Sequence, residues 1–215
     1  MTRQNRRRRG RRDFLRHSLF GAAGLVTTYG LAGCGPRESA AALLPPPSPA
    51  DGEGEPDNIS SRAVLPAWGV AGAPLAVSGR VFAPDGRTPA GGVTIYVYHT
   101  DARGLYSESD GDGREPRPRI KGWVRADSEG RYEFQTTRPG SYPRGRNPAH
   151  IHAKAYGAGY PEQWLDEYWF EDDPLVTAEM RAPFKDLGPF SPILKISRDA
   201  GGVIRCARDI RLEKA

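Results

Sequence analysis

The sequence predicts an all-β fold, a single-domain antiparallel or mixed β-sandwich of about eight strands with long loops, over residues 65–215. Three observations predict it. Short stretches of β-branched and aromatic residues alternate with other residues at a period of two, and clusters of Gly, Pro, Asp and Ser separate these stretches. The roughly 150 residues concerned are also enough to bury one hydrophobic core.

The alternating stretches define the expected strands. They lie at residues 75–81, 93–98, 122–125, 131–134 and 193–196, and turn signals at 83–86, 89–92, 127–130 and 138–140 separate them. Helix is expected only as a turn or two near residues 160–165. Cys206 lies in a short apolar stretch and is expected to be a small core residue.

Residues 1–33 differ from the rest of the chain in charge. They hold eight arginines and one acidic residue, a net +7, whereas the whole chain carries a formal +5, so the remaining residues carry −2. The basic pI is therefore a property of this segment, and it does not predict a nucleic-acid partner.

The same segment has the three parts of an export signal. Arg11 and Arg12 stand before Phe14 in a basic region, an apolar run follows at residues 19–31, and Cys34 closes it. This resembles a twin-arginine lipoprotein signal peptide. The resemblance implies export in the folded state, lipidation of Cys34 and attachment to a membrane on its extracytoplasmic or periplasmic face. With Cys34 lipidated, Cys206 has no partner for an intramolecular disulfide.

Residues 34–64 are expected to form a tether without packed structure. The stretch combines a proline-rich run at 44–49 with an acidic, glycine-rich run at 51–56, and it shows no apolar periodicity.

His150-Ile151-His152 is the first indication of a chemical site. In an extended strand, side chains two residues apart point to the same face, so His150 and His152 can bind one metal ion. Outside the signal segment the chain has one further histidine, His99. A His-x-His pair alone fits ordinary hydrogen-bonded histidines in a strand equally well.

Neighbouring motifs extend the pattern. Gly130-Arg131-Tyr132, Arg138-Pro139-Gly140-Ser141-Tyr142-Pro143, Pro148-Ala149-His150-Ile151-His152 and Trp169-Phe170-Glu171-Asp172-Asp173-Pro174 follow one another in this order. Over about residues 70–212, this combination resembles the intradiol ring-cleavage dioxygenases of the protocatechuate 3,4-dioxygenase type. The resemblance implies a non-haem Fe(III) cofactor whose ligands fall on Tyr106, Tyr142, His150 and His152.

The resemblance also implies a reaction. Phenolates are hard anionic donors suited to Fe(III), and two neutral imidazoles leave one position open for hydroxide or substrate. A catechol-type aromatic ring would be cleaved with O2 between its two hydroxylated carbons, giving a muconate-type diacid. Tyr142 matches the tyrosine that leaves the metal and takes a substrate proton.

Two positions depart from the family pattern and are expected to affect catalysis or the choice of substrate. Asn147 stands where an arginine is common, with Arg146 one place earlier. Asn147 offers only a neutral hydrogen bond, unless the short loop lets Arg146 enter the site. Glu167 stands where glutamine is usual, and its carboxylate could act as a base or repel an acidic substrate. Neutral catechols are therefore favoured over carboxylated ones.

The predicted partners are thus a catechol-type substrate, O2 and a membrane through the lipid on Cys34, with no nucleic acid; an oligomer is compatible with this pattern. Two other classes of function stay open. One is a non-catalytic β-sandwich binding lipoprotein. The other is a zinc site built on His99, His150 and His152, since three histidines form a catalytic zinc set.

Overall fold

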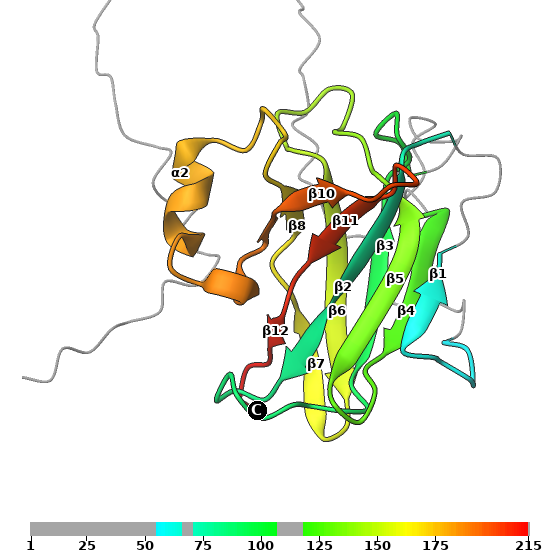
Figure 1. Ribbon diagram of the computed structural model, residues 1–215, viewed down its shortest axis with the longest axis vertical. Coiled ribbons are helices and arrows are strands. Elements are labelled where there is room, and N and C mark those ends of the chain that lie inside the picture. Colours follow the sequence, from blue (N-terminus) through cyan, green and yellow to red (C-terminus); the bar gives the residue numbers. More distant parts are fainter. Residues whose placement is uncertain (1–54, 66–70, 107–117, 215) are drawn as a thin grey trace, which may run out of the picture. The chain divides into compact units, whose positions relative to one another are not determined.

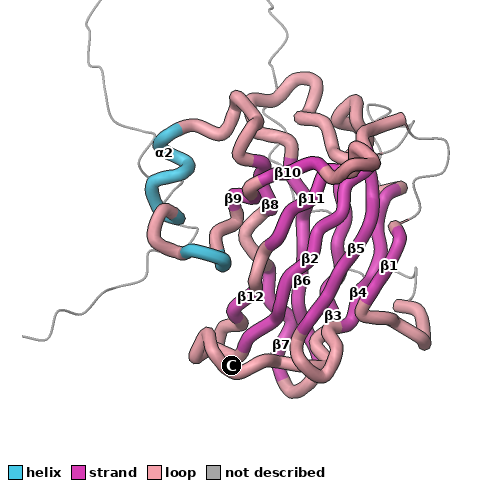
Figure 2. Tube along the Cα trace, in the orientation of Figure 1, coloured by secondary structure: helices cyan, strands magenta, loops and turns pink. Residues whose placement is uncertain are grey.

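A computed structural model of the chain describes residues 55–65, 71–106 and 118–214. The predicted signal peptide, Cys34 and most of the predicted tether lie outside these residues. The described part is a sandwich of two mixed sheets with very little helix (Figures 1 and 2). The prediction of an all-β sandwich is confirmed, with twelve strands in the described residues where about eight were expected.

The first sheet has the order β1-β5-β2-β11-β10, and β12 also pairs with β2. Its strands are β1 (Arg62–Val64), β2 (Pro74–Phe82), β5 (Arg131–Thr137), β10 (Ile196–Arg198), β11 (Ile204–Ala207) and β12 (Ile210–Arg211).

The second sheet has the order β4-β3-β6-β8-β9, and β7 also pairs with β6. Its strands are β3 (Thr94–His99), β4 (Ile120–Arg125), β6 (His150–Gly157), β7 (Tyr160–Trp164), β8 (Tyr168–Phe170) and β9 (Ile193–Leu194). Between β8 and β9 the chain forms α2 (Ala178–Arg181), η1 (Ala182–Phe184) and η2 (Gly188–Phe190), which stand to one side of the sheets (Figure 2).

The expectation of a helical turn near residues 160–165 is wrong, because this stretch forms the edge strand β7. Gly157, Ala158 and Gly159 all have positive φ and turn the chain straight back from β6 into an antiparallel hairpin. Pro161 lacks a backbone N–H, which an edge strand tolerates. Short helical turns instead occur at residues 178–190.

The stretch 193–196, expected to be one strand, is divided between the sheets. Residues Ile193–Leu194 (β9) pair with β8 in the second sheet, whereas Ile196–Arg198 (β10) pairs with β11 in the first. The chain therefore crosses from one sheet to the other at Lys195. The alternation of apolar and polar residues over four positions predicts a strand but does not reveal that its two halves pair with strands of different sheets.

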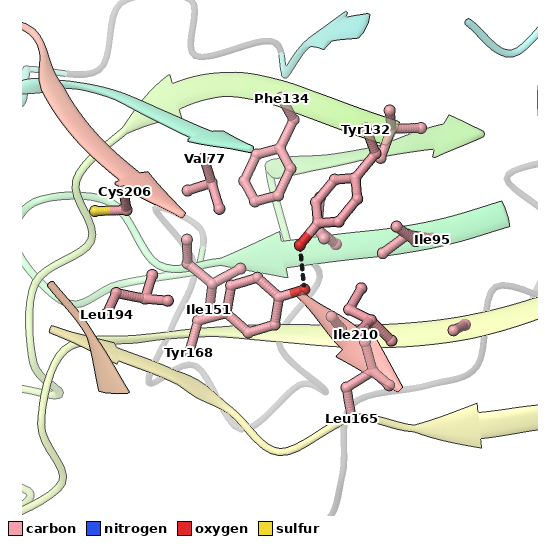
Figure 3. Packing of buried hydrophobic residues seen from close by; sticks show 14 of the residues in the cluster. Val77, Ile95, Tyr132, Phe134, Ile151, Leu165, Tyr168, Leu194, Cys206 and Ile210 are labelled. Carbon is pink, nitrogen blue, oxygen red and sulfur yellow. Dashed lines mark hydrogen bonds between the residues drawn. The ribbon is translucent and has the colours of Figure 1, made fainter. Parts of the chain in front are cut away.

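The core lies between the sheets, where the inward-facing side chains of both sheets meet (Figure 3). Val77 and Phe134 from the first sheet and Ile151 from the second are fully buried. Burying a side chain of this size contributes about 1.5–3 kcal/mol each. The hydroxyl groups of Tyr132 and Tyr168 meet inside this cluster at 3.4 Å, and Tyr132 also donates to the carbonyl oxygen of Arg208. Cys206 is buried and free, as expected for a core residue.

Residues 55–65 fasten the two sheets together along one edge. β1 pairs in parallel with β5, and its neighbour Ser60 accepts a hydrogen bond from the backbone N–H of Arg125 at the end of β4. Leu65 is buried against Gly122 of β4. Glu55 binds the Arg125 guanidinium at 3.0 Å and accepts a hydrogen bond from the Tyr156 hydroxyl at 2.8 Å. Residues 55–64, which were expected to belong to the tether, are thus part of the sandwich.

In the described residues, no helix combines the length and the apolar character needed to cross a bilayer.

Candidate metal centre

Strand β6 places His150 and His152 on the outer face of the second sheet. In its antiparallel pairing with β3, His152 lies opposite Tyr98 and Ile151 lies opposite His99. Because successive side chains alternate between faces, Ile151 and His99 point into the sandwich, and His152 and Tyr98 point outward. The Tyr98 ring stacks on the His152 ring with centroids 4.7 Å apart and planes 16° apart, which limits the rotation of the imidazole.

The loop after β3 carries Tyr106, and a buried aspartate shapes this loop. The Asp101 carboxylate accepts backbone hydrogen bonds from Arg103 at 2.8 Å and Leu105 at 3.0 Å, and binds the Arg103 guanidinium. The pKa of Asp101 is lowered: burial raises it, but the hydrogen bonds from Leu105 and Arg103 outweigh that effect. The ionised carboxylate therefore fixes the turn that presents Tyr106.

The loop after β5 carries Tyr142 and packs directly against the Tyr106 loop. The Thr100 hydroxyl donates to the Gly140 carbonyl at 2.8 Å, and the Gly140 N–H donates to the Asp101 carbonyl at 2.8 Å. Gly104 has a positive φ of 84°, and a Cβ there would overlap the Ser141 carbonyl. Glycine is therefore needed at residue 104 both for its backbone angle and for the close approach of the two loops.

An ion pair holds the start of the Tyr142 loop to the chain beyond β8. The Arg138 guanidinium makes two hydrogen bonds to the Asp172 carboxylate, at 2.7 and 2.6 Å. Bidentate pairs of this kind fix orientation as well as distance. The pKa of Asp172 is lowered, chiefly by the hydrogen bond from Arg138.

The two loops and β6 bring four donor atoms together. The hydroxyls of Tyr106 and Tyr142 are 2.5 Å apart, and the Nε2 atoms of His150 and His152 are 3.1 Å apart. The Tyr142 hydroxyl lies 3.1 Å from His150 Nε2 and 3.4 Å from His152 Nε2, and the Tyr106 hydroxyl lies 3.0 Å from His152 Nε2. We call these four side chains the tetrad.

Contacts behind the histidines direct their Nε2 atoms toward the tetrad. His150 Nδ1 lies 2.6 Å from the Pro148 carbonyl oxygen, an acceptor that keeps the proton on Nδ1 and leaves the Nε2 lone pair available. The peptide between them is fixed in turn by the buried Asp173, whose carboxylate accepts hydrogen bonds from Ala149 N–H at 2.8 Å and Leu175 N–H at 2.9 Å.

Glu167 lies behind His152. Its Oε1 atom is 3.6 Å from His152 Nδ1, and its Oε2 atom accepts a hydrogen bond of 3.3 Å from the Trp169 indole N–H. His150, His152 and Glu167 are also the one group of at least three His, Cys, Asp or Glu side chains in the described ranges that is close enough to hold a metal ion.

Tyr106 is neutral when no cation is present. Burial, followed by the neighbouring Tyr142 hydroxyl, raises the pKa of Tyr106 far above its ordinary value. A trivalent cation would reverse this preference, because it stabilises a phenolate strongly.

The tetrad fits a metal ion in geometry and in donor type. With metal–donor distances of about 2.0–2.1 Å, donors that subtend 90–120° lie about 2.9–3.6 Å apart, and most of the tetrad separations fall in or near this range. Two phenol oxygens with two imidazole nitrogens form a mixed set of hard and intermediate donors, which suits iron.

His99 does not join the tetrad. It lies on the inner face of the sheet, 1 % exposed, with Nδ1 2.6 Å from the Thr100 carbonyl and Nε2 2.8 Å from the Thr136 hydroxyl. Burial lowers the pKa of His99 to about 4, so the ring is neutral. The three-histidine zinc site is therefore a wrong expectation, since β-strand alternation sends His99 to the opposite face from His152.

Arg146 and Asn147 lie in the exposed part of the loop between Tyr142 and Pro148. Within the ranges that the structure describes, neither makes a hydrogen bond or an ion pair with the tetrad. Their roles in catalysis stay predictions.

Sequence reasoning missed the aspartates that organise the ligand loops. The sequence motifs assign no role to Asp101, Asp172 or Asp173. For Asp101 and Asp173 the available signal is an aspartate just after a strand, because such residues accept backbone hydrogen bonds from residues two or more positions further along the chain.

Fold and site together define a β-sandwich protein with a cluster of two tyrosines and two histidines suited to a metal. A model of the family described as Dioxygenase (Dioxygenase_C) matches residues 63–187, and the chain belongs to this family.

Individual relatives agree with this family. The chain is 28% identical over 119 residues to catechol 1,2-dioxygenase 1 of Acinetobacter lwoffii, which covers 48% of this chain and 38% of that protein. It is 32% identical over 110 residues to the protocatechuate 3,4-dioxygenase beta chain of Burkholderia cepacia, covering 47% and 46%. The chain therefore spans less than half the length of each of these relatives.

Solved structures show the same fold. The dioxygenase domain of a dioxygenase and carbohydrate-binding protein fusion from Streptomyces sp. SirexAA-E superimposes with a TM-score of 0.52 at 26% identity, covering 80% of this chain and all of that one. Catechol 1,2-dioxygenase from Acinetobacter sp. ADP1 gives a TM-score of 0.56 at 18% identity, covering 75% and 59%.

Proposed function

We propose that this protein is a non-haem Fe(III) intradiol dioxygenase that cleaves catechol-type rings between the two hydroxylated carbons with O2, giving muconate-type diacids. The observation that carries the proposal is the convergence of Tyr106, Tyr142, His150 and His152, each of whose donor atoms lies 2.5–3.4 Å from at least two of the others. Membership of the dioxygenase family and the named activities of the relatives support it.

A bound ferric ion would supply Lewis acidity that draws electrons from the catechol ring, and a template for substrate and O2. The protein supplies the rest. The carbonyl of Pro148 orients the His150 ring so that Nε2 faces the tetrad, and the Tyr98 ring holds the plane of His152. The strand thus presents two imidazole ligands in fixed orientations.

Tyr142 differs from the histidines in how it is held. It lies in a loop rather than in a strand, and its carbonyl accepts a hydrogen bond from Gly145 within the same loop. As a ligand on a loop, Tyr142 could move away from a bound metal with little disturbance of the sheet. Its phenolate, with an ordinary pKa of about 10, is a strong enough base to take a proton from a substrate hydroxyl.

The preferred substrates are neutral catechols. Glu167 places a carboxylate beside the tetrad, with a side chain 23% exposed. A carboxylated ring bound close to it would meet like-charge repulsion, which costs affinity in a partly buried site.

The purified full-length protein tests the proposal. It should contain iron and absorb visible light through tyrosinate-to-iron charge transfer, and it should consume O2 with a panel of catechols. Tyr142→Phe and His152→Ala should lose this uptake, while Tyr160→Phe in the edge strand β7 should keep it. A colourless protein that takes up no iron would reject the function, and full uptake in both site variants would reject the ligand assignment.

Export and anchoring form a separate proposal, which the sequence of residues 1–34 supports. The twin-arginine pair and Cys34 lead us to propose a folded, lipid-anchored protein on the extracytoplasmic face. Replacing Arg11 and Arg12 by lysine should leave an unprocessed precursor in the cytoplasm, and mass spectrometry should find lipid on Cys34 of the mature wild-type chain. A mature chain that begins elsewhere would overturn this assignment.

A further inference from the structure

We infer that Glu167 is a positioning residue that acts on the metal through His152. Its carboxylate lies on the Nδ1 side of the imidazole ring, where its negative charge makes Nε2 a stronger donor, and it thereby favours the ferric state of the bound ion. This inference rests on the proposed function, because it requires iron at the tetrad. It gives Glu167 a role other than that of a base beside the open coordination position.

The sheet register brings Glu167 to His152. In the antiparallel pairing of β6 with β8, His150 lies opposite Trp169 and Ile151 lies opposite Tyr168. Extending this register by one residue puts Glu167 opposite His152, on the same face. Cross-strand neighbours of this kind have Cβ atoms about 4.5–5.5 Å apart, within reach of a glutamate and a histidine.

The carboxylate faces the nitrogen that the tetrad does not use. Glu167 Oε1 lies 3.6 Å from His152 Nδ1, whereas His152 Nε2 lies 3.0 Å from the Tyr106 hydroxyl and 3.1 Å from His150 Nε2. The two ring nitrogens point in different directions, so a metal on Nε2 leaves Nδ1 facing the carboxylate.

The carboxylate is itself held in place. The indole N–H of Trp169 donates to Oε2 at 3.3 Å, which leaves Oε1 directed at the histidine. The Trp169 ring packs edge-on against Phe184, with centroids 5.9 Å apart. Glu167 is also only partly exposed, at 23% for its side chain, so solvent screens its charge incompletely.

A carboxylate behind a histidine ligand has two effects. Its negative charge favours the tautomer with the proton on Nδ1, and it makes Nε2 a stronger donor. His150 receives only a neutral carbonyl at the corresponding nitrogen, from Pro148. The two histidines of the tetrad are therefore unequal, and the negative charge behind His152 stabilises Fe(III) more than Fe(II).

Glu167→Gln in the full-length, iron-loaded protein tests this role, because glutamine keeps the size and the hydrogen-bonding shape and removes the charge. Iron affinity, measured by competition with a chelator, should fall about 10–100-fold. The reduction potential should rise, by about 59 mV for each tenfold loss of the ferric preference. The charge-transfer band should move to longer wavelength, because the ion becomes a better electron acceptor.

Asp166→Asn is the matched control, since it removes the same charge from the exposed neighbouring residue and should change none of the three measurements. Trp169→Phe removes the N–H that holds Oε2 and should shift the band in the same direction by less, which keeps the test open if the glutamine variant does not fold. Unchanged affinity, potential and band in Glu167→Gln would overturn the inference, as would equal shifts in Asp166→Asn. A wild-type protein without iron would instead reject the proposed function on which the inference rests.

Discussion

His99 and His152 lie on neighbouring strands of one sheet, and the sandwich uses them in opposite ways. On the inner face, both nitrogens of His99 are occupied by Thr100 and Thr136. On the outer face, His152 turns Nε2 toward two phenols and a second imidazole. One residue of register separates them, since His99 pairs with Ile151 and Tyr98 with His152. The face of the strand, rather than the residue type, thus decides whether a histidine supports the core or forms a site.

The largest effect should follow from removing the outer histidine. His152→Ala should lower iron affinity by more than about 100-fold, because losing a ligand costs more than losing the partner behind it. Its thermal unfolding temperature should stay near that of the metal-free wild type. Metal analysis with calorimetry checks both, and an alanine variant that retains full iron would break the comparison.

The inner histidine should show the reverse. His99→Ala should lower the free energy of unfolding by about 3 kcal/mol, because it leaves a cavity and an unpaired buried Thr136 hydroxyl. The folded fraction should still bind iron and show the charge-transfer colour. Denaturant titration and metal analysis measure the two outcomes, and a loss of iron without a loss of stability would contradict the assignment of His99 to the core.

The sequence predicts the core face of the second sheet better than it predicts the face that carries the tetrad. Alternation of β-branched and aromatic residues located the strand that became β3, and so the core face, because burial imposes a period of two. The tetrad combines one strand with two loops, and no periodicity brings Tyr106 and Tyr142 to His150. Those tyrosines came from the family resemblance. The sequence pattern also does not reveal which strands pair with one another, as the division of residues 193–196 between the two sheets shows.

A pH titration sharpens the comparison. Burial lowers the pKa of His99 to about 4 in the folded protein, from 6.5 in the unfolded chain. Between these values the unfolded chain binds a proton that the folded protein does not, so stability falls as pH falls. Between pH 7 and pH 5 this residue should cost about 2 kcal/mol. The difference between wild type and His99→Gln in denaturant titrations isolates it, and parallel pH curves would refute a buried neutral imidazole.

The smallest effect on stability should come from a substitution on the outer face of the second sheet, away from the tetrad. The Lys154 ammonium lies 4.4 Å from the centroid of the Trp164 ring, and Trp164 is 38% exposed. Trp164→Leu should therefore lower stability by about 0.5–1 kcal/mol and leave iron binding unchanged. Thermal unfolding and chelator competition test this, and a large loss of iron affinity would extend the functional part of the outer face along β6.

The edge segment at residues 55–65 limits how far the sandwich can stand from its proposed anchor. Because Arg125 and Tyr156 bind Glu55, the sandwich already includes residue 55, so residues 35–54 rather than 35–64 separate it from Cys34. Twenty residues span at most about 70 Å, against about 105 Å for thirty. With the lipid anchor proposed above, this length sets the greatest distance between the sandwich and the membrane surface.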